Sequence, residues 1–301
     1  MKKLPVELAR YLLVVLLLIL LTITLGPTGA ADYPLVIQDQ FGRAVRLNSP
    51  PQRIVSGSPG NTELLFALGL GERVIGVTDW CDYPPAVKGK PRIGNIAPLN
   101  IEKVLSLRPD LVLACNLNGK EPVENLTELG VPTFALNPVS FSAIIEAIRL
   151  VGQITGQEQQ AAELATAFIS TIEQVKRKGQ ATEERMKVLV AIGDNLQDLW
   201  TAGSGTFLDE VVTLCGGENI AAGLGFSWAR LGMEYILKMN PDLILTELEP
   251  QVFLEDPFYK ELTAGRKRQI YQIDVDVFSR PGPRLIEALN ELVLLFEQAA
   301  R

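Results

Sequence analysis

The sequence predicts an α/β protein of two similar lobes, each with a mostly parallel central sheet, bridged by one long α-helix. Three observations support this prediction: a repeated segment, an alternation of short strands and helices, and an unbroken helical stretch in mid-chain. Residues 100–114 read NIEKVLSLRPDLVLA and residues 232–246 read GMEYILKMNPDLILT, at a constant offset of 132 residues. A period of that length is too long for a solenoid, so it indicates a duplicated domain.

Each copy of the repeat predicts a short amphipathic helix that proline ends, followed by an apolar strand. The Pro-Asp-Leu step recurs at residues 109–111 and 241–243, and the glutamates Glu102 and Glu234 coincide. A single helix-surface glutamate is usually a solvated residue of little energetic value. Two of them related by duplication would suit two arginines of a symmetric partner.

The rest of the chain follows the same alternation, which is typical of a parallel α/β sheet. We divide it into an N-terminal lobe (31–140), a helical bridge (141–184) and a C-terminal lobe (185–301). The predicted strands are a hairpin over 35–47, which turns at Phe41-Gly42, and segments 53–56, 73–78, 111–114, 132–136, 187–192 and 270–273. The predicted helices span 62–68, capped by Asn61 or Thr62, and 100–108, 120–129, 141–155, 157–179, 206–214, 232–240 and 285–299. Residues 193–204 and 274–284 are predicted to be loops.

The bridge contains the longest predicted helix of the chain. Apolar residues from Ala161 to Val175 recur at helical spacing. A helix over 157–179 would span roughly 35 Å, about the width of a domain. Because this connection is a rod and not a Gly/Ser-rich linker, we expect the lobes to keep a nearly fixed separation.

The N-terminal 30 residues have the composition of a signal peptide. Lys2, Lys3 and Arg10 precede an uncharged run over 11–25, and small residues follow this run. That run is shorter than the roughly 20 residues of a spanning helix. We therefore expect export to the periplasm or the outer face of the cytoplasmic membrane, with cleavage after Ala30 or Ala31 and an uncleaved anchor as the alternative. No cysteine follows the run, so no lipoprotein attachment site is predicted.

Composition excludes several function classes. The net charge of −7 and the pI near 4.9 argue against nucleic-acid binding. The chain has no histidine, which excludes Ser-His-Asp and Cys-His catalysis and zinc sites built on histidine. Phosphate-loop and nucleophile-elbow motifs are also absent from the sequence. We predict a non-enzymatic binding protein without a cofactor or resident metal; an exported two-lobed enzyme and a membrane-anchored sensor are the rivals.

The candidate ligand residues follow predicted strands, because parallel sheets bind ligands beyond their carboxyl ends. All three tryptophans are in these loops, together with amides and a few charged residues. Flat aromatics with a few amides suit a large, partly apolar ligand, although aromatics also commonly pack in cores. The set is Trp80, Tyr83, Cys115, Asn116, Asn118, Asn195, Trp200, Phe226, Trp228, Glu247, Asp276, Phe278 and Arg280.

Several segments together resemble one known protein family. They are VIQDQFGRAVRL (36–47), SPGNTELLFALGLGERVIGVTDWCDYPP (58–85), NIEKVLSLRPDLVLA (100–114), LDEVVTLCGGENI (208–220) and FSRPGPRLIEAL (278–289). Over about residues 35–300 the chain resembles the periplasmic substrate-binding proteins of ABC importers for corrinoids, ferric siderophores and haem. Residues 61–64, 82–85 and 215–219 are most similar to the cobalamin-binding members. The resemblance implies the class III periplasmic-binding-protein fold.

The resemblance also implies roles for individual residues. Glu102 and Glu234 match the family's docking glutamates, which implies that they contact arginines of a permease dimer. The protein itself is expected to be a monomer when it is not docked. Tyr83, Trp200, Trp228 and Asp276 match ligand-binding positions of the family. Cys115 and Val277 stand where a corrinoid binder can have an aromatic residue. The expected cargo is cobalamin or another metal chelate, with ferric siderophore (through Arg230, Arg280 or Arg284) and haem (through Tyr83 or a cysteine) as alternatives.

Overall fold

The fold is described from a computed structural model in which residues 32–180 and 185–299 are placed, except for the side chains of Val275 and Ser279. From Tyr33 onward these residues belong to one compact unit. The predicted signal segment, residues 1–30, lies outside the described residues, as do residues 181–184 of the predicted bridge. Among the described helices, none combines the length and the apolar character that crossing a membrane requires.

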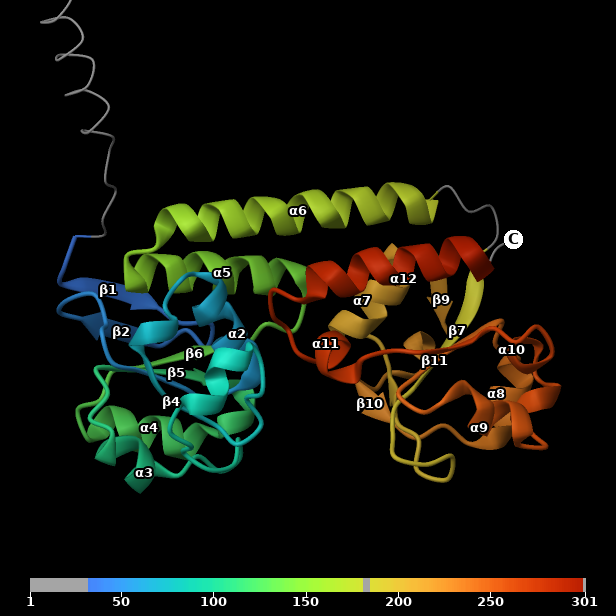
Figure 1. Ribbon diagram of the computed structural model, residues 1–301, viewed down its shortest axis with the longest axis horizontal. Coiled ribbons are helices and arrows are strands. Elements are labelled where there is room, and N and C mark those ends of the chain that lie inside the picture. The colour runs from blue at the N-terminus through green and yellow to red at the C-terminus, as the bar shows by residue number, and fades with distance from the viewer. Residues whose placement is uncertain (1–31, 181–184, 300–301) are drawn as a thin grey trace, which may run out of the picture. The chain divides into compact units, whose positions relative to one another are not determined.

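Each lobe has a four-stranded parallel sheet within the described ranges, and the two sheets share one topology (Figure 1). The strand order is β4-β3-β5-β6 in the first lobe and β9-β7-β11-β12 in the second, so each lobe runs second, first, third, fourth. This shared order confirms the predicted duplication and the α/β fold class. The strands are β3 (Ile54–Ser56), β4 (Val74–Val77), β5 (Leu111–Cys115), β6 (Thr133–Leu136), β7 (Met186–Ala191), β9 (Gly217–Asn219), β11 (Leu243–Thr246) and β12 (Ile270–Gln272).

The repeated aspartates have the same structural role in both lobes. The backbone N–H of Asp110 donates to the carbonyl of Arg53 at 3.0 Å, and its carboxylate accepts from the N–H groups of Gln52 and Arg53 at 2.8 Å. The backbone N–H of Asp242 donates to Lys187 at 2.8 Å, and its carboxylate accepts from the N–H of Lys187 at 2.9 Å. Each aspartate therefore anchors the third strand of its lobe to the start of the first.

The remaining elements agree with most predicted ranges to within one or two residues. Two pairs of short antiparallel strands accompany the sheets: β1 (Leu35–Gln38) with β2 (Ala44–Leu47), and β8 (Thr201–Ala202) with β10 (Trp228–Ala229). The α-helices are α2 (Pro59–Ala67), α3 (Ile101–Ser106), α4 (Lys120–Glu128), α5 (Phe141–Thr155), α6 (Glu158–Gln180), α7 (Phe207–Leu214), α8 (Met233–Met239), α9 (Pro250–Glu255), α10 (Thr263–Arg266), α11 (Val275–Ser279) and α12 (Leu285–Ala299).

Two predicted boundaries were wrong, and side-chain caps explain both. Helix α2 begins at Pro59 because Ser58, not Asn61 or Thr62, caps it: the Ser58 hydroxyl accepts from the N–H of Asn61. The predicted loop over 274–284 contains α11, because the carboxylate of Asp274 accepts from the N–H groups of Asp276 and Val277. The β8–β10 ribbon, strand β9 and helices α9 and α10 were likewise not predicted.

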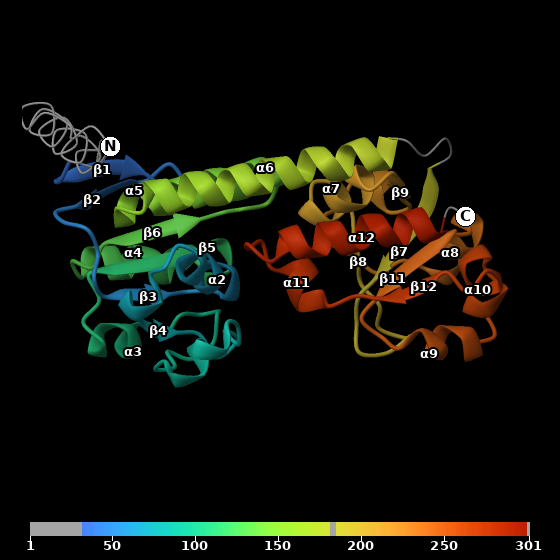
Figure 2. The same cartoon turned by 45° about the horizontal axis from the view of Figure 1, so that its top comes forward.

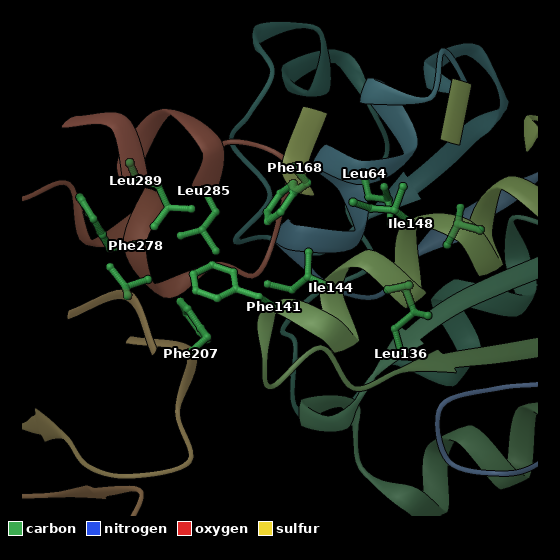
Figure 3. Packing of buried hydrophobic residues seen from close by; sticks show 14 of the residues in the cluster. Leu64, Leu136, Phe141, Ile144, Ile148, Phe168, Phe207, Phe278, Leu285 and Leu289 are labelled. Carbon is green, nitrogen blue, oxygen red and sulfur yellow. The ribbon is translucent and has the colours of Figure 1, made fainter. Parts of the chain in front are cut away.

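Helix α6 spans both lobes, as the bridge prediction requires. It packs against α5 of the first lobe and against α7 and α12 of the second (Figures 1 and 2). Its approach to α5 is close, since a Cβ added to Gly152 would lie 2.3 Å from the Cβ of Ala161. Helix α5 itself packs on the first lobe, where Ile144 and Ile148 lie near Leu64 and Leu136 (Figure 3).

One hydrophobic cluster continues from the first lobe into the second. Phe141 of α5 lies beside Phe207 of α7 and Leu285 of α12 (Figure 3), and its ring centroid is 6.5 Å from that of Phe168 of α6. The N–H of Phe141 also donates to the carboxylate of Glu210 at 2.8 Å. These contacts hold the lobes together along α6, which supports the expectation of a nearly fixed separation.

Candidate functional site

A cavity of about 260 Å³ lies at the carboxyl ends of β3 and β5. This is the point where the strand order of the first lobe reverses, the position at which open parallel sheets bind ligands. The last loop of the second lobe also contributes to its wall. Five predicted ligand residues line the cavity: Trp80, Cys115, Asn116, Asp276 and Arg280.

Asn118 holds the floor of this cavity together. Its side chain is fully buried; its Oδ1 accepts from the N–H of Cys115 at 2.8 Å, and its Nδ2 donates to the carbonyls of Gly57 and Ile96 at 2.8 and 2.9 Å. A Cβ on Gly57 would lie 2.4 Å from Asn118 Oδ1, so glycine is required there. The prediction that Asn118 contacts the ligand is therefore corrected: it joins three loops and exposes no polar atom.

Two aromatic side chains of the first lobe are exposed and are held in place by neighbours. Trp80 is 59% exposed, and its Nε1 donates to Asn95 Oδ1 at 2.8 Å. Tyr83 is 41% exposed, and the Arg284 guanidinium lies 4.2 Å from its ring centroid. Large aromatics are usually well buried, so these two rings form a prepared apolar surface.

A network of five charged residues lies beside the cavity. Arg280 pairs with Asp82 at 2.5 Å and with Asp276 at 2.6 Å, and it lies 3.9 Å from Glu63. Arg284 pairs with Glu63 at 2.6 Å. Glu63 and Asp82 belong to the first lobe and the arginines to the segment around the start of α12, so the network connects the lobes. It contains three carboxylates and two guanidinium groups and has a net negative charge.

The environment shifts several pKa values at the site in different directions. Burial raises the pKa of Glu63, although the hydrogen bonds from Arg284 oppose the shift. The hydrogen bond from Arg280 lowers the pKa of Asp82. Burial raises the pKa of the Cys115 thiol, which disfavours its thiolate form. All three cysteines, including Cys81 and Cys215, are free thiols in the structure.

The predicted ligand residues of the second lobe lie in a different region. Trp200 and Trp228 are each 43% exposed and belong to the β8–β10 region, where the Arg230 guanidinium lies 5.1 Å from the Trp200 ring centroid and pairs with Asp198. Asn195 is exposed, and Phe226 and Glu247 are half-buried. None of these predicted residues is among the described residues that line the 260 Å³ cavity.

Phe278 requires a correction. Its side chain is 2% exposed and packs in the hydrophobic cluster near Leu289 (Figure 3). The residue lies in α11, in a segment predicted to be a loop. One face of this short helix therefore packs in the core, while Asp276 faces outward and is exposed.

Glu102 and Glu234 occupy equivalent places in the two lobes. Each is the second residue of its helix, α3 or α8, and each side chain is exposed. A carboxylate in the first turn of a helix is favoured by the helix dipole. The structure thus provides one outward-facing glutamate per lobe.

The sequence did not identify several residues that support the site. Glu63 forms the buried ion pair with Arg284, which the sequence suggested only as a contact for a ferric siderophore, and Asn95 fixes Trp80. Asn61, which lines the cavity, donates through Nδ2 to the carbonyls of Leu113 and Ala114 at 3.0 Å. The one sequence signal for the ion pair was Glu63 at the start of the apolar run ELLFAL, since a buried carboxylate needs a partner.

Comparisons with known proteins agree with this architecture. Residues 54–277 match the family described as Periplasmic binding protein. A substrate-binding lipoprotein of an ABC transporter from Bacillus subtilis is 32% identical over 268 residues, covering 86% of this chain and 84% of the relative. The vitamin B12-binding protein of Pectobacterium carotovorum is 30% identical over 245 residues, covering 80% and 87%.

Solved structures show the same fold. The apo periplasmic haem-binding protein RhuT of Roseiflexus sp. RS-1 is 30% identical with a TM-score of 0.76, covering 83% of this chain and 99% of that one. The vitamin B12-binding protein BtuF of Vibrio cholerae is 25% identical with a TM-score of 0.74, covering 83% and 98%. These likenesses confirm the predicted two-lobed class III fold. With its matching helices, sheets and sequence, the chain belongs to the Periplasmic binding protein family.

Proposed function

We propose that this protein is the extracytoplasmic substrate-binding component of an ABC importer and that its cargo is a corrinoid, specifically cobalamin. The family match, the ABC-transporter and B12-binding relatives and the exposed aromatic residues support the proposal. It is a carrier and not an enzyme, and the ligand is cargo and not a cofactor. The choice of a corrinoid as cargo rests on the pairing of the charged residues at the site.

Every arginine at the proposed site already has a carboxylate partner within the described residues. Arg280 and Arg284 belong to the five-residue network, and Arg230 pairs with Asp198. A cargo with several carboxylates would need unpaired cations, because an anion beside a net negative network is repelled. A corrinoid instead has carboxamides at its edge, which suit the amide of Asn116 and the exposed carboxylate of Asp276.

The aromatic residues supply the apolar part of the recognition. Trp80, Tyr83, Trp200 and Trp228 are each more than two-fifths exposed, and together they include every tryptophan of the chain. Their ring faces suit the faces of a large, flat ligand, and a specific site of this kind combines apolar walls with a few polar groups. Binding of one corrinoid would cover this exposed apolar area.

Haem is the second candidate, and Tyr83 is the observation that favours it. The Tyr83 side chain is 41% exposed, and within residues 32–180 and 185–299 its hydroxyl makes no hydrogen bond. Tyrosine oxygen is an established axial ligand of haem iron. A haem-binding relative is 30% identical, as the B12-binding one is.

A three-ligand titration tests the choice between these cargoes. Purified protein is titrated with cyanocobalamin, haemin and a ferric siderophore while tryptophan fluorescence is recorded. We expect saturable one-to-one quenching by cyanocobalamin at a Kd below about 1 μM. Trp80→Ala should weaken it about tenfold, while Leu129→Ala, an exposed apolar residue at the end of α4, should not. A response to haemin or siderophore without one to cyanocobalamin would replace the corrinoid.

Delivery to the importer is proposed to involve Glu102 and Glu234. Their equivalent positions in the two lobes suit a permease dimer that presents one arginine to each lobe. Glu102→Ala with Glu234→Ala should abolish uptake in cells and leave the Kd for cyanocobalamin unchanged. The matched control removes two other exposed helix glutamates, Glu128 and Glu291. Normal uptake by the first double variant would disprove this docking assignment.

A further inference from the structure

Two apolar side chains of the second lobe are exposed beside Glu234. Met233 and Leu237 of α8 are 55% and 58% exposed. Residues three and four positions apart are neighbours on a helix surface, so Leu237 lies next to both Met233 and Glu234. These three side chains form one surface, which we call the α8 patch. Within residues 32–180 and 185–299 Glu234 makes no ion pair, so its carboxylate is available to a cation from outside.

The first lobe has apolar residues at the same two positions and buries them further. The counterparts of the two apolar residues, 132 positions earlier in the repeat, are Ile101 and Leu105. Both are half-buried and pack against a hydrophobic cluster that includes Ile93 and Leu99. In the first lobe these two repeat positions therefore stabilise the fold of the lobe itself.

The difference follows from the connection that precedes each repeat helix. The connection from the second strand of the sheet to this helix covers residues 78–100 in the first lobe and residues 220–232 in the second, which is ten residues fewer. The longer connection supplies Ile93 and Leu99 to the cluster on which α3 packs. In the second lobe, among the described residues, the equivalent face of α8 stays exposed.

We infer that the α8 patch is an apolar docking surface for the permease, whose complementary surface has an arginine bordered by apolar side chains. The inference rests on the proposed function, because it extends the docking assignment of Glu234 to Met233 and Leu237. Two side chains bury far less than the roughly 800 Å² per partner of a stable interface, so the patch does not by itself hold a second copy of this chain. A lipid surface is disfavoured because an unpaired carboxylate is costly to bury there.

The two lobes then contact the permease through different chemistry. The exposed neighbours of Glu102 on α3 are Lys103 and Ser106, which are polar. Docking of the first lobe relies on an ion pair, whereas docking of the second lobe combines an ion pair with apolar burial. The equivalent glutamates are therefore surrounded by surfaces that distinguish one lobe from the other.

The first test replaces the apolar side chains and keeps the glutamate. Met233→Gln with Leu237→Gln retains good helix formers of similar length. This double variant should lower cellular uptake of cyanocobalamin about tenfold, because apolar burial is lost, and should leave the Kd for cyanocobalamin unchanged. The control, Val36→Gln with Leu294→Gln, replaces two comparably exposed residues of β1 and α12 and should keep normal uptake. Normal uptake by the α8 variant would overturn the inference.

A second measurement does not depend on the cargo, and it alone decides if the wild-type protein supports no uptake of cyanocobalamin. The photoreactive residue p-benzoylphenylalanine is introduced in place of Leu237 and irradiated in intact cells, and mass spectrometry identifies the adducts. We expect an adduct with the membrane-spanning permease subunit of an ABC importer. The same probe in place of Leu294 should give no such adduct. An adduct of the Leu237 probe with lipid or with a second copy of this chain, or no adduct, would overturn the inference.

A failure of the docking proposal itself is recognised with the probe in place of Ser106, which is four residues after Glu102 on α3. Permease adducts from the Ser106 position without any from the Leu237 position would overturn the α8 patch and retain docking through the first lobe. Absence of permease adducts from both positions would overturn the docking assignment of Glu102 and Glu234 as well.

Discussion

The ion pair between Glu63 and Arg284 provides the most exacting test of the structure, through the substitution Arg284→Met. The Glu63 side chain is 2% exposed and that of Arg284 is 14% exposed, so solvent screens the pair little. Two hydrogen bonds join them, at 3.0 and 2.6 Å. Methionine keeps most of the length of the side chain and removes the charge.

The expected cost is large because the substitution leaves a buried carboxylate without its main partner. Arg280, at 3.9 Å, is the remaining nearby cation and is shared with Asp82 and Asp276. Breaking a buried ion pair from one side typically costs about 3–5 kcal/mol. We expect a loss of about 3 kcal/mol in the free energy of unfolding at pH 7, since Arg280 compensates in part. For a domain of this size the melting temperature should fall by roughly 5–10 °C.

The loss of stability in Arg284→Met should also depend on pH, and the protonation of Glu63 sets the direction of this dependence. Burial already raises the pKa of Glu63 in the wild-type protein, and removal of Arg284 removes the main opposing influence. A carboxyl group with a raised pKa takes up its proton in the folded state before the unfolded state does. Lowering the pH from 7 toward about 4.3 should therefore reduce the stability gap between the Arg284→Met variant and the wild-type protein.

Urea unfolding followed by circular dichroism at pH 7 and pH 5 measures these quantities. Adding Glu63→Gln to Arg284→Met removes the buried charge and should recover more than half of the loss. Arg266→Met is the control, because Arg266 pairs with Glu261 at the surface and its loss should cost less than about 1 kcal/mol. A stable Arg284→Met variant at pH 7, or a double variant weaker than the single one, would refute the reasoning.

Two further predictions concern residues that support the first-lobe cavity without lining it. Asn118→Ala should cost about 2–3 kcal/mol, because it leaves the N–H of Cys115 and the carbonyls of Gly57 and Ile96 without their partner; urea unfolding measures the loss, and an unchanged stability would contradict the structural role given to Asn118. At pH values above the usual aspartate pKa of about 3.9, Asp82→Asn should slightly lower the melting temperature, because it removes the carboxylate that pairs with Arg280. Arg280 lowers the pKa of Asp82 in the folded state, so this stabilisation is lost as the pH falls through the lowered folded-state pKa. Thermal scans of both proteins from pH 7 downward measure the difference, and a difference that does not shrink as the pH falls would exclude the Asp82–Arg280 pair as its cause.

Local patterns along the chain were sufficient to predict most of the fold. The repeat with its Pro-Asp-Leu steps indicated two lobes, and the apolar period between Ala161 and Val175 indicated the bridging helix. These signals are readable because secondary structure follows from the spacing of apolar residues and from proline and glycine nearby. The starts of α2 and α11 were harder to locate, because several neighbouring residues could have capped each helix.

The candidate site was predictable to the level of loops and only partly to the level of side chains. Trp80, Cys115 and Asn116 line the first-lobe cavity because they lie at or beyond the carboxyl ends of strands in one parallel sheet. Asp276 and Arg280 also line it, but they reach it from the segment after β12 of the second lobe. Asn118 and Phe278 follow strands as well, yet their side chains turn into the protein. Loop position along the chain does not reveal the direction of a side chain, which depends on the hydrogen bonds and packing around it.

The sequence by itself therefore determined the fold class, the duplication, the bridging helix and the two equivalent glutamates Glu102 and Glu234. Only the tertiary structure decided which charges neutralise one another. The partners Glu63 and Arg284 are 221 residues apart, and Arg280 and Asp82 are 198 apart. No local pattern links residues at such separations, because their contact exists only after the two lobes have packed along α6. That packing leaves the arginines of the site paired and the aromatic rings exposed.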